Sequence, residues 1–135
     1  MPVTKEFTVF MEDRPGTLGK VCRALADRNV NILALHSFPI GGRAVTRFVV
    51  DNPIAAKTAL DNERLPCIQG EVVQVKLPHQ PGQIGRVAAR LGEAGININY
   101  AYCGVEPGTN TPLVFFGVDE IGQAAPLLEQ VAAAA

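Results

Sequence analysis

Two short stretches decide the fold: EDRPGTL at residues 12–18 and PHQPGQI at residues 78–84. In each stretch, a Pro-Gly pair follows a strand-like run and precedes a run with the apolar spacing of a helix. A shift of 66 positions, from Pro15 to Pro81, superimposes them and also aligns further matching pairs. These pairs are Gly16 and Gly82, Gly19 and Gly85, Val21 and Val87, Leu25 and Leu91, Asn31 and Asn97, and Ile32 and Ile98. The sequence therefore predicts a tandem duplication.

The first repeat predicts the element order of a ferredoxin-like βαββαβ unit, which is an α+β fold with an antiparallel sheet and helices on one face. The alternation of Phe7, Val9 and Met11 predicts a strand, and Leu18, Val21, Cys22, Leu25 and Ala26 recur with helical spacing. A turn at Gly41-Gly42 joins two further predicted strands. The predicted elements are strand 6–12, a helix ending near Asn29, strands 31–38 and 43–50, helix 53–63 and extended segment 67–77.

The second repeat predicts the same order but stops one strand short. Its elements are strand 71–77, a helix marked by Ile84, Val87, Ala88 and Leu91, strands 97–105 and 112–118, and helix 120–132 despite Pro126. The second unit therefore lacks its own final strand, and residues 66–77 serve both units. An open sheet edge invites pairing, so we expect a homodimer or an intimately paired tandem, with units at residues 1–70 and 71–135.

The stretches EDRPGTLGKVCRALADRNVNI (12–32) and PHQPGQIGRVAARLGEAGINI (78–98) resemble the ACT domain family. This family comprises small allosteric regulatory modules that bind amino acids in biosynthetic enzymes. The similarity covers nearly the whole chain, which implies a stand-alone tandem ACT protein without a catalytic domain. The resemblance also implies a ligand between the Pro-Gly corner and the second strand, usually at an interface between domains, and a regulated enzyme partner that the sequence does not identify.

The Pro-Gly corners have physical features that suit a ligand. A helix start leaves its first N–H groups unpaired and partly positive, so it stabilises an amino-acid carboxylate. Gly16 and Gly82 allow close approach to the backbone. Asp13 is a candidate partner for the ligand's ammonium group. The predicted ligand-binding residues are Asp13, Arg14, Pro15, Gly16, Thr17, Leu18, Asn31 and Ile32 in the first unit, and His79, Gln80, Pro81, Gly82, Gln83, Ile84, Asn97 and Ile98 in the second.

Purely structural interpretations of the same residues stay open. Each Pro-Gly pair is also consistent with a simple tight turn, and Asp13 with a helix cap. Gly19 and Gly85 are predicted to let the helices approach the sheets closely. Two other functions are also open: a small enzyme that uses His79 with Asp13 or Glu106, and an assembly module that binds no ligand. Neither Gly-x-Gly-x-x-Gly nor Cys-x-x-Cys occurs, so the sequence predicts no cofactor and no metal.

The composition limits the remaining classes of function. A net charge of −1 argues against a nucleic-acid partner, and no apolar run approaches the ~20 residues of a membrane helix. No signal peptide is visible at the N-terminus. Cys22, Cys67 and Cys103 are widely spaced and odd in number, which is a poor disulfide framework. We therefore expect a cytoplasmic protein of 135 residues that binds neither membranes nor nucleic acids.

Overall fold

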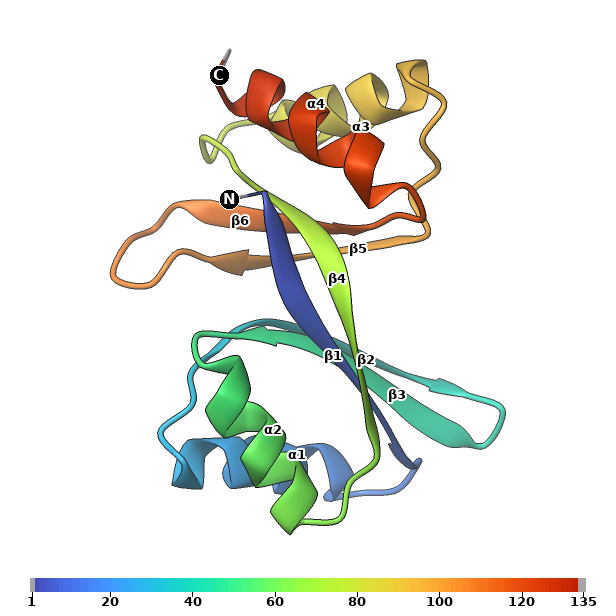
Figure 1. Ribbon diagram of the computed structural model, residues 1–135, viewed down its shortest axis with the longest axis vertical. Helices are drawn as coiled ribbons and strands as arrows, with labels where there is room; N and C mark the ends of the chain where they lie inside the picture. The colour runs from blue at the N-terminus through green and yellow to red at the C-terminus, as the bar shows by residue number, and fades with distance from the viewer. Residues whose placement is uncertain (1, 134–135) are drawn as a thin grey trace. The chain divides into compact units, whose positions relative to one another are not determined.

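The computed structural model describes residues 2–133, which form six strands and four helices (Figure 1). In chain order these are β1 (Val3–Glu12), α1 (Thr17–Asp27), β2 (Ile32–Ile40), β3 (Arg43–Val50), α2 (Pro53–Asn62), β4 (Cys67–Lys76), α3 (Gln83–Glu93), β5 (Tyr100–Val105), β6 (Pro112–Gly117) and α4 (Ile121–Ala133). The chain divides into two compact units, Lys5–Gly70 and Glu71–Ala135, and the second includes the first four residues of the chain. The predicted order β-α-β-β-α occurs twice and is confirmed.

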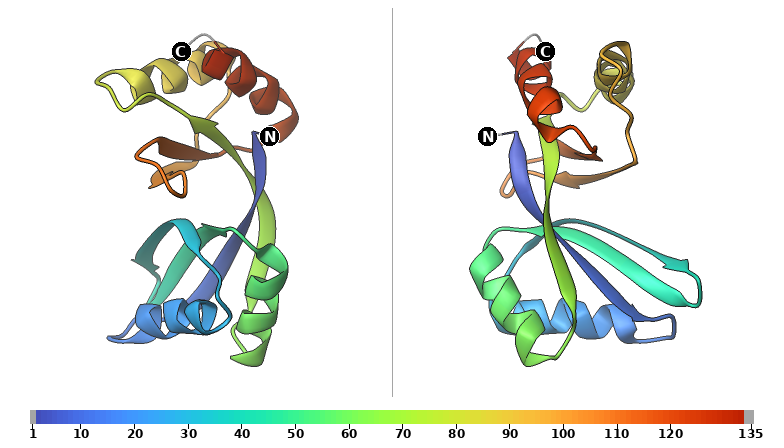
Figure 2. Two further views of the ribbon diagram at one scale, coloured as in Figure 1. Left: turned by 90° about the vertical axis from the view of Figure 1, so that its left-hand side faces the viewer. Right: turned by 45° about the vertical axis from the view of Figure 1, so that its right-hand side comes forward.

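In the unit Lys5–Gly70, β1 pairs with β3 and β3 pairs with β2, all antiparallel. Helices α1 and α2 lie together on one face of these strands (Figures 1 and 2). The hairpin between β2 and β3 turns at Gly41 and Gly42, whose φ angles are 57° and 79°. Such positive φ values favour glycine, so the turn predicted at this Gly-Gly pair is confirmed.

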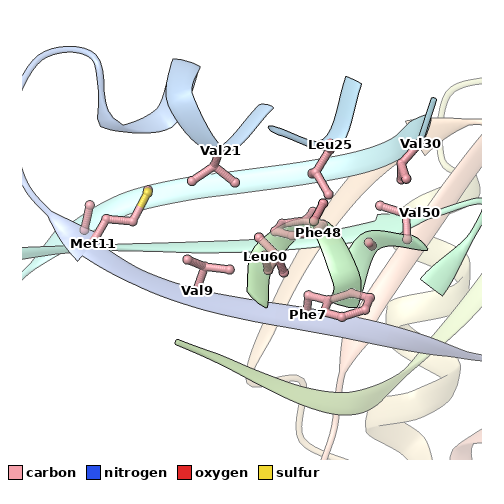
Figure 3. Packing of buried hydrophobic residues seen from close by; sticks show 12 residues of the cluster. Phe7, Val9, Met11, Val21, Leu25, Val30, Phe48, Val50 and Leu60 are labelled. Atoms are coloured by element: carbon pink, nitrogen blue, oxygen red, sulfur yellow. The ribbon is translucent and has the colours of Figure 1, made fainter. Parts of the chain in front are cut away.

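The apolar alternation of β1 places its side chains in the core of this unit (Figure 3). Phe7 and Phe48 are opposite each other in the register of β1 and β3, and their rings stack with centroids 5.5 Å apart. Leu25 of α1 and Leu60 of α2 complete this core, and all four side chains are fully buried. The side chains that predicted the strand and the helix are therefore those that hold α1 and α2 on the sheet.

The unit Glu71–Ala135 has the corresponding pairings, in which β4 pairs with β6 and β6 with β5, all antiparallel. Its core is built around Val73, Leu91, Phe116 and Leu128. Helix α4 continues through Pro126, as predicted.

Strands β1 and β4 each contribute residues to both units. Val3 packs against the core of the C-terminal unit, and the Gln74 N–H donates to the Pro2 carbonyl over 2.7 Å. Cys67, at the start of β4, packs against the core of the N-terminal unit. The predicted continuous strand across residues 66–77 is confirmed as β4. The prediction that the second unit lacks a final strand was incomplete, because the start of β1 lies beside β4.

Two local predictions are wrong. Strand β5 begins at Tyr100 rather than at Asn97, because side chains hold this segment: Asn97 Nδ2 donates to Asn99 Oδ1, and Asn99 Nδ2 donates to Asp119 Oδ1. Gly19 and Gly85 do not permit close packing, since both are exposed and a Cβ atom on either would meet open space. No helix within residues 2–133 has the length and apolar character needed to cross a membrane.

Candidate functional site

The first corner, residues 12–18, is fixed by three backbone hydrogen bonds. The Arg14 N–H donates to the Glu12 carbonyl over 3.1 Å, and the Thr17 N–H donates to the Arg14 carbonyl over 3.4 Å. The Lys20 N–H then donates to the Gly16 carbonyl over 3.1 Å, which begins α1. The backbone therefore turns sharply from β1 into the helix.

The second corner, residues 78–84, repeats all three bonds with the 66-residue shift. Gln80 N–H donates to the Pro78 carbonyl over 2.9 Å, and Gln83 N–H donates to the Gln80 carbonyl over 3.4 Å. Arg86 N–H donates to the Gly82 carbonyl over 2.9 Å and begins α3. The repeat in the sequence is thus a repeat of backbone hydrogen bonding.

Glycine is required at both corners by the backbone conformation. Gly16 has φ 93° and Gly82 has φ 87°, which lie in the left-handed region. No side chain of residues 2–133 caps either helix start, and Asp13 is exposed. The capping alternative for Asp13 is therefore wrong. The N–H groups that follow those of Thr17 and Gln83 in the first turn of each helix keep their capacity to bind an acceptor.

Gly16→Ala is expected to lower the free energy of unfolding by about 1–2 kcal/mol, because an L-residue at this φ is strained. Gly19→Ala is the matched control, since it makes the same change two residues into the same helix. There the new Cβ meets open space, and the change should stabilise by about 0.5–1 kcal/mol. Urea unfolding measures both, and equal effects of the two substitutions would contradict the assigned conformation of Gly16.

A first hollow of about 330 Å³ lies against the first corner. It is lined by Phe10, Met11, Glu12, Arg14, Thr17, Lys20, Val21, Gly42, Arg43 and Leu65. Arg14 Nε lies 2.8 Å from Glu12 Oε2, and the Arg43 guanidinium lies 5.4 Å from the centre of the Phe10 ring. The walls of this hollow are therefore rich in charged side chains.

A second hollow of about 580 Å³ lies against the second corner. It is lined by Leu77, Pro78, His79, Gln80, Pro81, Gln83, Ile84, Cys103, Gly104, Val105, Asn110, Pro112 and Val114. Its walls are mainly apolar, and its polar groups are a few amides, one imidazole and one thiol. A concave apolar surface with a few polar groups is the usual form of a small-molecule site.

The structure brings only part of the predicted residue set to the hollows. Arg14 and Thr17 line the first, and His79, Gln80, Pro81, Gln83 and Ile84 line the second. Asp13, Pro15, Gly16, Leu18 and Gly82 belong to the corners but line neither hollow.

The residues predicted at the start of the second strand lie at the far end of each unit's first helix. Helix α1 has 11 residues and so spans about 16 Å between the corner and the segment that follows it. There the Asn31 N–H donates to Asp51 Oδ1 over 2.9 Å, and Ile32 packs against the core. Asn97 bonds to Asn99, and Ile98 packs against the core of its own unit. None of these four residues lines the first or the second hollow, and in each unit the helix separates them from the corner.

Several lining residues were missed by the sequence reasoning. Lys20 follows Thr17 by three residues and therefore lies on the same helix face. This spacing could have predicted that Lys20 lines the first hollow together with Thr17. Arg43 and Val105 reach the hollows from the β2–β3 and β5–β6 hairpins. No local pattern predicts these contacts, because they depend on how each hairpin lies beside its corner.

Within the C-terminal unit, the two groups that the catalytic alternative names, His79 and Glu106, do not come together. Glu106 is paired with Lys76, with Oε2 2.5 Å from Nζ, and it does not line the hollow that contains His79. Among residues 2–133 no three metal-binding side chains cluster. His36 lies outside both hollows, and its pKa is lowered by burial and by Arg47 opposite it on β3.

Comparison with known proteins finds a family match within the first unit. The ACT domain model matches residues 6–64, and no curated protein matches the sequence. Among solved structures, protein BT0572 from Bacteroides thetaiotaomicron is 26% identical with a TM-score of 0.84, over 96% of this chain and 88% of that one. The ligand-free regulatory subunit of aspartate kinase from Thermus thermophilus is 20% identical with a TM-score of 0.63, over 96% and 92%. The Thermus flavus regulatory subunit is 20% identical with a TM-score of 0.58, over 97% of both chains.

These two aspartate kinase subunits share the fold over 96% and 97% of this chain, and the family model covers most of its first unit. Residues 6–64 of this chain match the ACT domain family.

Proposed function

We propose that the chain is a non-catalytic regulatory protein built from two ACT modules, residues 1–70 and 71–135. Each module binds an amino acid or a similar small zwitterion at its Pro-Gly corner. The ACT match and the fold shared with regulatory subunits of aspartate kinase support a regulatory role. We place the protein in the cytoplasm as a homodimer or an intimately paired tandem, acting on an enzyme partner still to be found.

The observation that carries this proposal is the coincidence of two features at each corner. A glycine-started helix without a side-chain cap lies beside a hollow of about 330 Å³ in one unit and about 580 Å³ in the other. A simple tight turn accounts for the glycine but not for the hollow. Backbone N–H groups and a neighbouring concave surface together suit a carboxylate with a side chain attached.

Each corner has partners for the carboxylate and for the ammonium group of a zwitterion. The ligand carboxylate lies on the N–H groups around Gly16–Leu18, where the helix dipole favours negative charge. The ammonium group meets Glu12, which lines the hollow, rather than Asp13, which does not. At the second corner the N–H groups are those around Gly82–Ile84, and the amide oxygens of Gln80, Gln83 and Asn110 accept from the ammonium.

A thermal-shift screen of the twenty amino acids tests this function. A ligand that binds only the folded chain at 100 times its Kd stabilises it by about 2.7 kcal/mol, so at least one amino acid should raise Tm with increasing concentration. The methyl ester of that amino acid is the control, because it keeps the ammonium and side chain but loses the carboxylate charge, and it should bind at least tenfold more weakly. Absence of any stabilising amino acid, or equal binding of the ester, would contradict the proposal.

A further inference from the structure

We infer that the two corners select different ligands: the first takes an amino acid with a second acidic group, and the second takes an amino acid with an uncharged apolar side chain. This inference rests on the proposed function and adds the ligand class of each corner. The backbone of the two corners is the same to within 0.2 Å in each of the three hydrogen bonds described above, so the ligand carboxylate meets equivalent N–H groups at both. Selectivity must therefore come from the side chains that line the hollows.

The first hollow carries an excess of positive charge. Three cationic side chains line it, Arg14, Lys20 and Arg43, against one carboxylate, Glu12. Glu12 is already paired with Arg14 over 2.8 Å. No carboxylate of residues 2–133 forms an ion pair with Lys20 or Arg43. A ligand side chain that ends in a carboxylate would meet two cations there, which is the arrangement that attracts an anion.

None of these charged side chains has a charged counterpart that lines the second hollow. Three of the four positions are occupied by uncharged residues. Pro78 and Gln80 replace Glu12 and Arg14 after the 66-residue shift. Thr111 replaces Arg43, because the strand registers relate β3 to β6 by a shift of 68. The fourth keeps its cation, because Arg86 corresponds to Lys20. Its side chain is occupied elsewhere: Nε and Nη2 donate to Gln83 Oε1 over 3.2 and 3.0 Å, and Nη1 donates to the Val131 carbonyl over 3.4 Å. Arg86 consequently does not line the second hollow.

The second hollow is also larger and lined by exposed apolar side chains. Ile84 and Val105 are 47% and 54% exposed and face this space together with Leu77 and Pro112. Exposed apolar surface gathered around a concavity marks a binding site for an apolar group. A branched or aromatic ligand side chain would cover this surface, whereas a charged side chain would lose its hydration there without gaining a partner.

Isothermal titration calorimetry of the full chain with L-glutamate, L-aspartate, L-leucine and L-phenylalanine tests the division. We expect at least one acidic and at least one apolar amino acid to bind, each at one site per chain and without competing with each other. Lys20→Gln combined with Arg43→Gln should weaken the acidic ligand at least tenfold and leave the apolar ligand within twofold. Ile84→Gln combined with Val105→Gln should do the reverse. Added salt should weaken the acidic ligand only, since it screens exposed charges.

Matched controls remove the same groups outside the hollows. Arg23→Gln deletes one positive charge from the exposed face of α1, and Ile54→Gln replaces a side chain on α2 that is 82% exposed. Neither residue lines the first or the second hollow, so both ligands should bind these variants as they bind the wild type. Gln80→Arg is a gain-of-function variant that restores one cation to the second corner, and it should improve binding of the acidic ligand there at least threefold.

The outcomes separate the inference from the function on which it rests. If no amino acid binds, the proposed function fails. If one amino acid fills both corners with equal affinity, or if Lys20→Gln with Arg43→Gln leaves the acidic ligand within threefold of wild type, the division of ligand classes is wrong while the proposed function stands. Urea unfolding of each variant measures its free energy of unfolding, and so distinguishes a loss of ligand affinity from a loss of the fold.

Discussion

Phe48→Ala is expected to lower the free energy of unfolding of the unit Lys5–Gly70 by about 3–5 kcal/mol. Phe48 is fully buried on β3, and its ring stacks on that of Phe7 with centroids 5.5 Å apart. Its removal leaves a cavity between the sheet and the two helices, which the surrounding side chains fill only in part. Urea unfolding followed by far-ultraviolet circular dichroism measures the loss.

Phe38→Ala is the matched control, because it deletes the same ring from β2 at a position that is 36% exposed. It should cost less than about 1 kcal/mol. The chain has two tyrosines and no tryptophan, and Tyr100 and Tyr102 both lie in the C-terminal unit. Tyrosine fluorescence therefore follows that unit, while hydrogen exchange resolves residues 5–70. Similar losses for Phe38→Ala and Phe48→Ala would contradict the assigned core.

Val3→Asp should destabilise the C-terminal unit by about 2 kcal/mol or more, although it lies at the opposite end of the sequence. Val3 packs against the core of residues 71–133, so the substitution removes apolar burial and brings a charge to the edge of that core. Hydrogen exchange should show a greater loss of protection in residues 71–133 than in residues 5–70. Tyrosine fluorescence should report unfolding at lower urea.

The control for this substitution is Val105→Asp, which makes the same change in the same unit at a side chain that is 54% exposed. It should cost under about 1 kcal/mol. If Val3→Asp loses protection only in residues 5–70, the assignment of Val3 to the core of the C-terminal unit is contradicted.

The sequence predicts the elements well wherever an apolar period continues through the core. Helix 53–63, predicted from a run that opens with proline, is α2 from Pro53 to Asn62, and Asn52 caps it by accepting from the Ala55 N–H over 3.1 Å. Both helices that follow the corners are also found where the period places them. Prediction fails at Asn97–Asn99, because side-chain hydrogen bonds to Asp119 compete with the strand, and such long-range bonds leave no periodic signal.

The candidate site also has a part that the sequence predicts and a part that it does not. The corners could be predicted because a Pro-Gly pair between a strand and a helix is a local pattern. The composition of each hollow could not, since it depends on hairpins that approach from elsewhere and on the direction of long side chains. Lys20 and Arg86 occupy equivalent positions, yet only Lys20 lines a hollow, because the Arg86 side chain donates to Gln83 and Val131 instead.

The exchange of strand ends between the two units sets the order in which the protein can fold during synthesis. Residues 5–70 can fold as soon as Gly70 has left the ribosome. The C-terminal unit needs Pro2–Thr4, which are made first and whose partner Gln74 is made much later. Until then these residues present an unpaired strand edge, so this is the stage at which the nascent chain is most exposed to pairing with another copy.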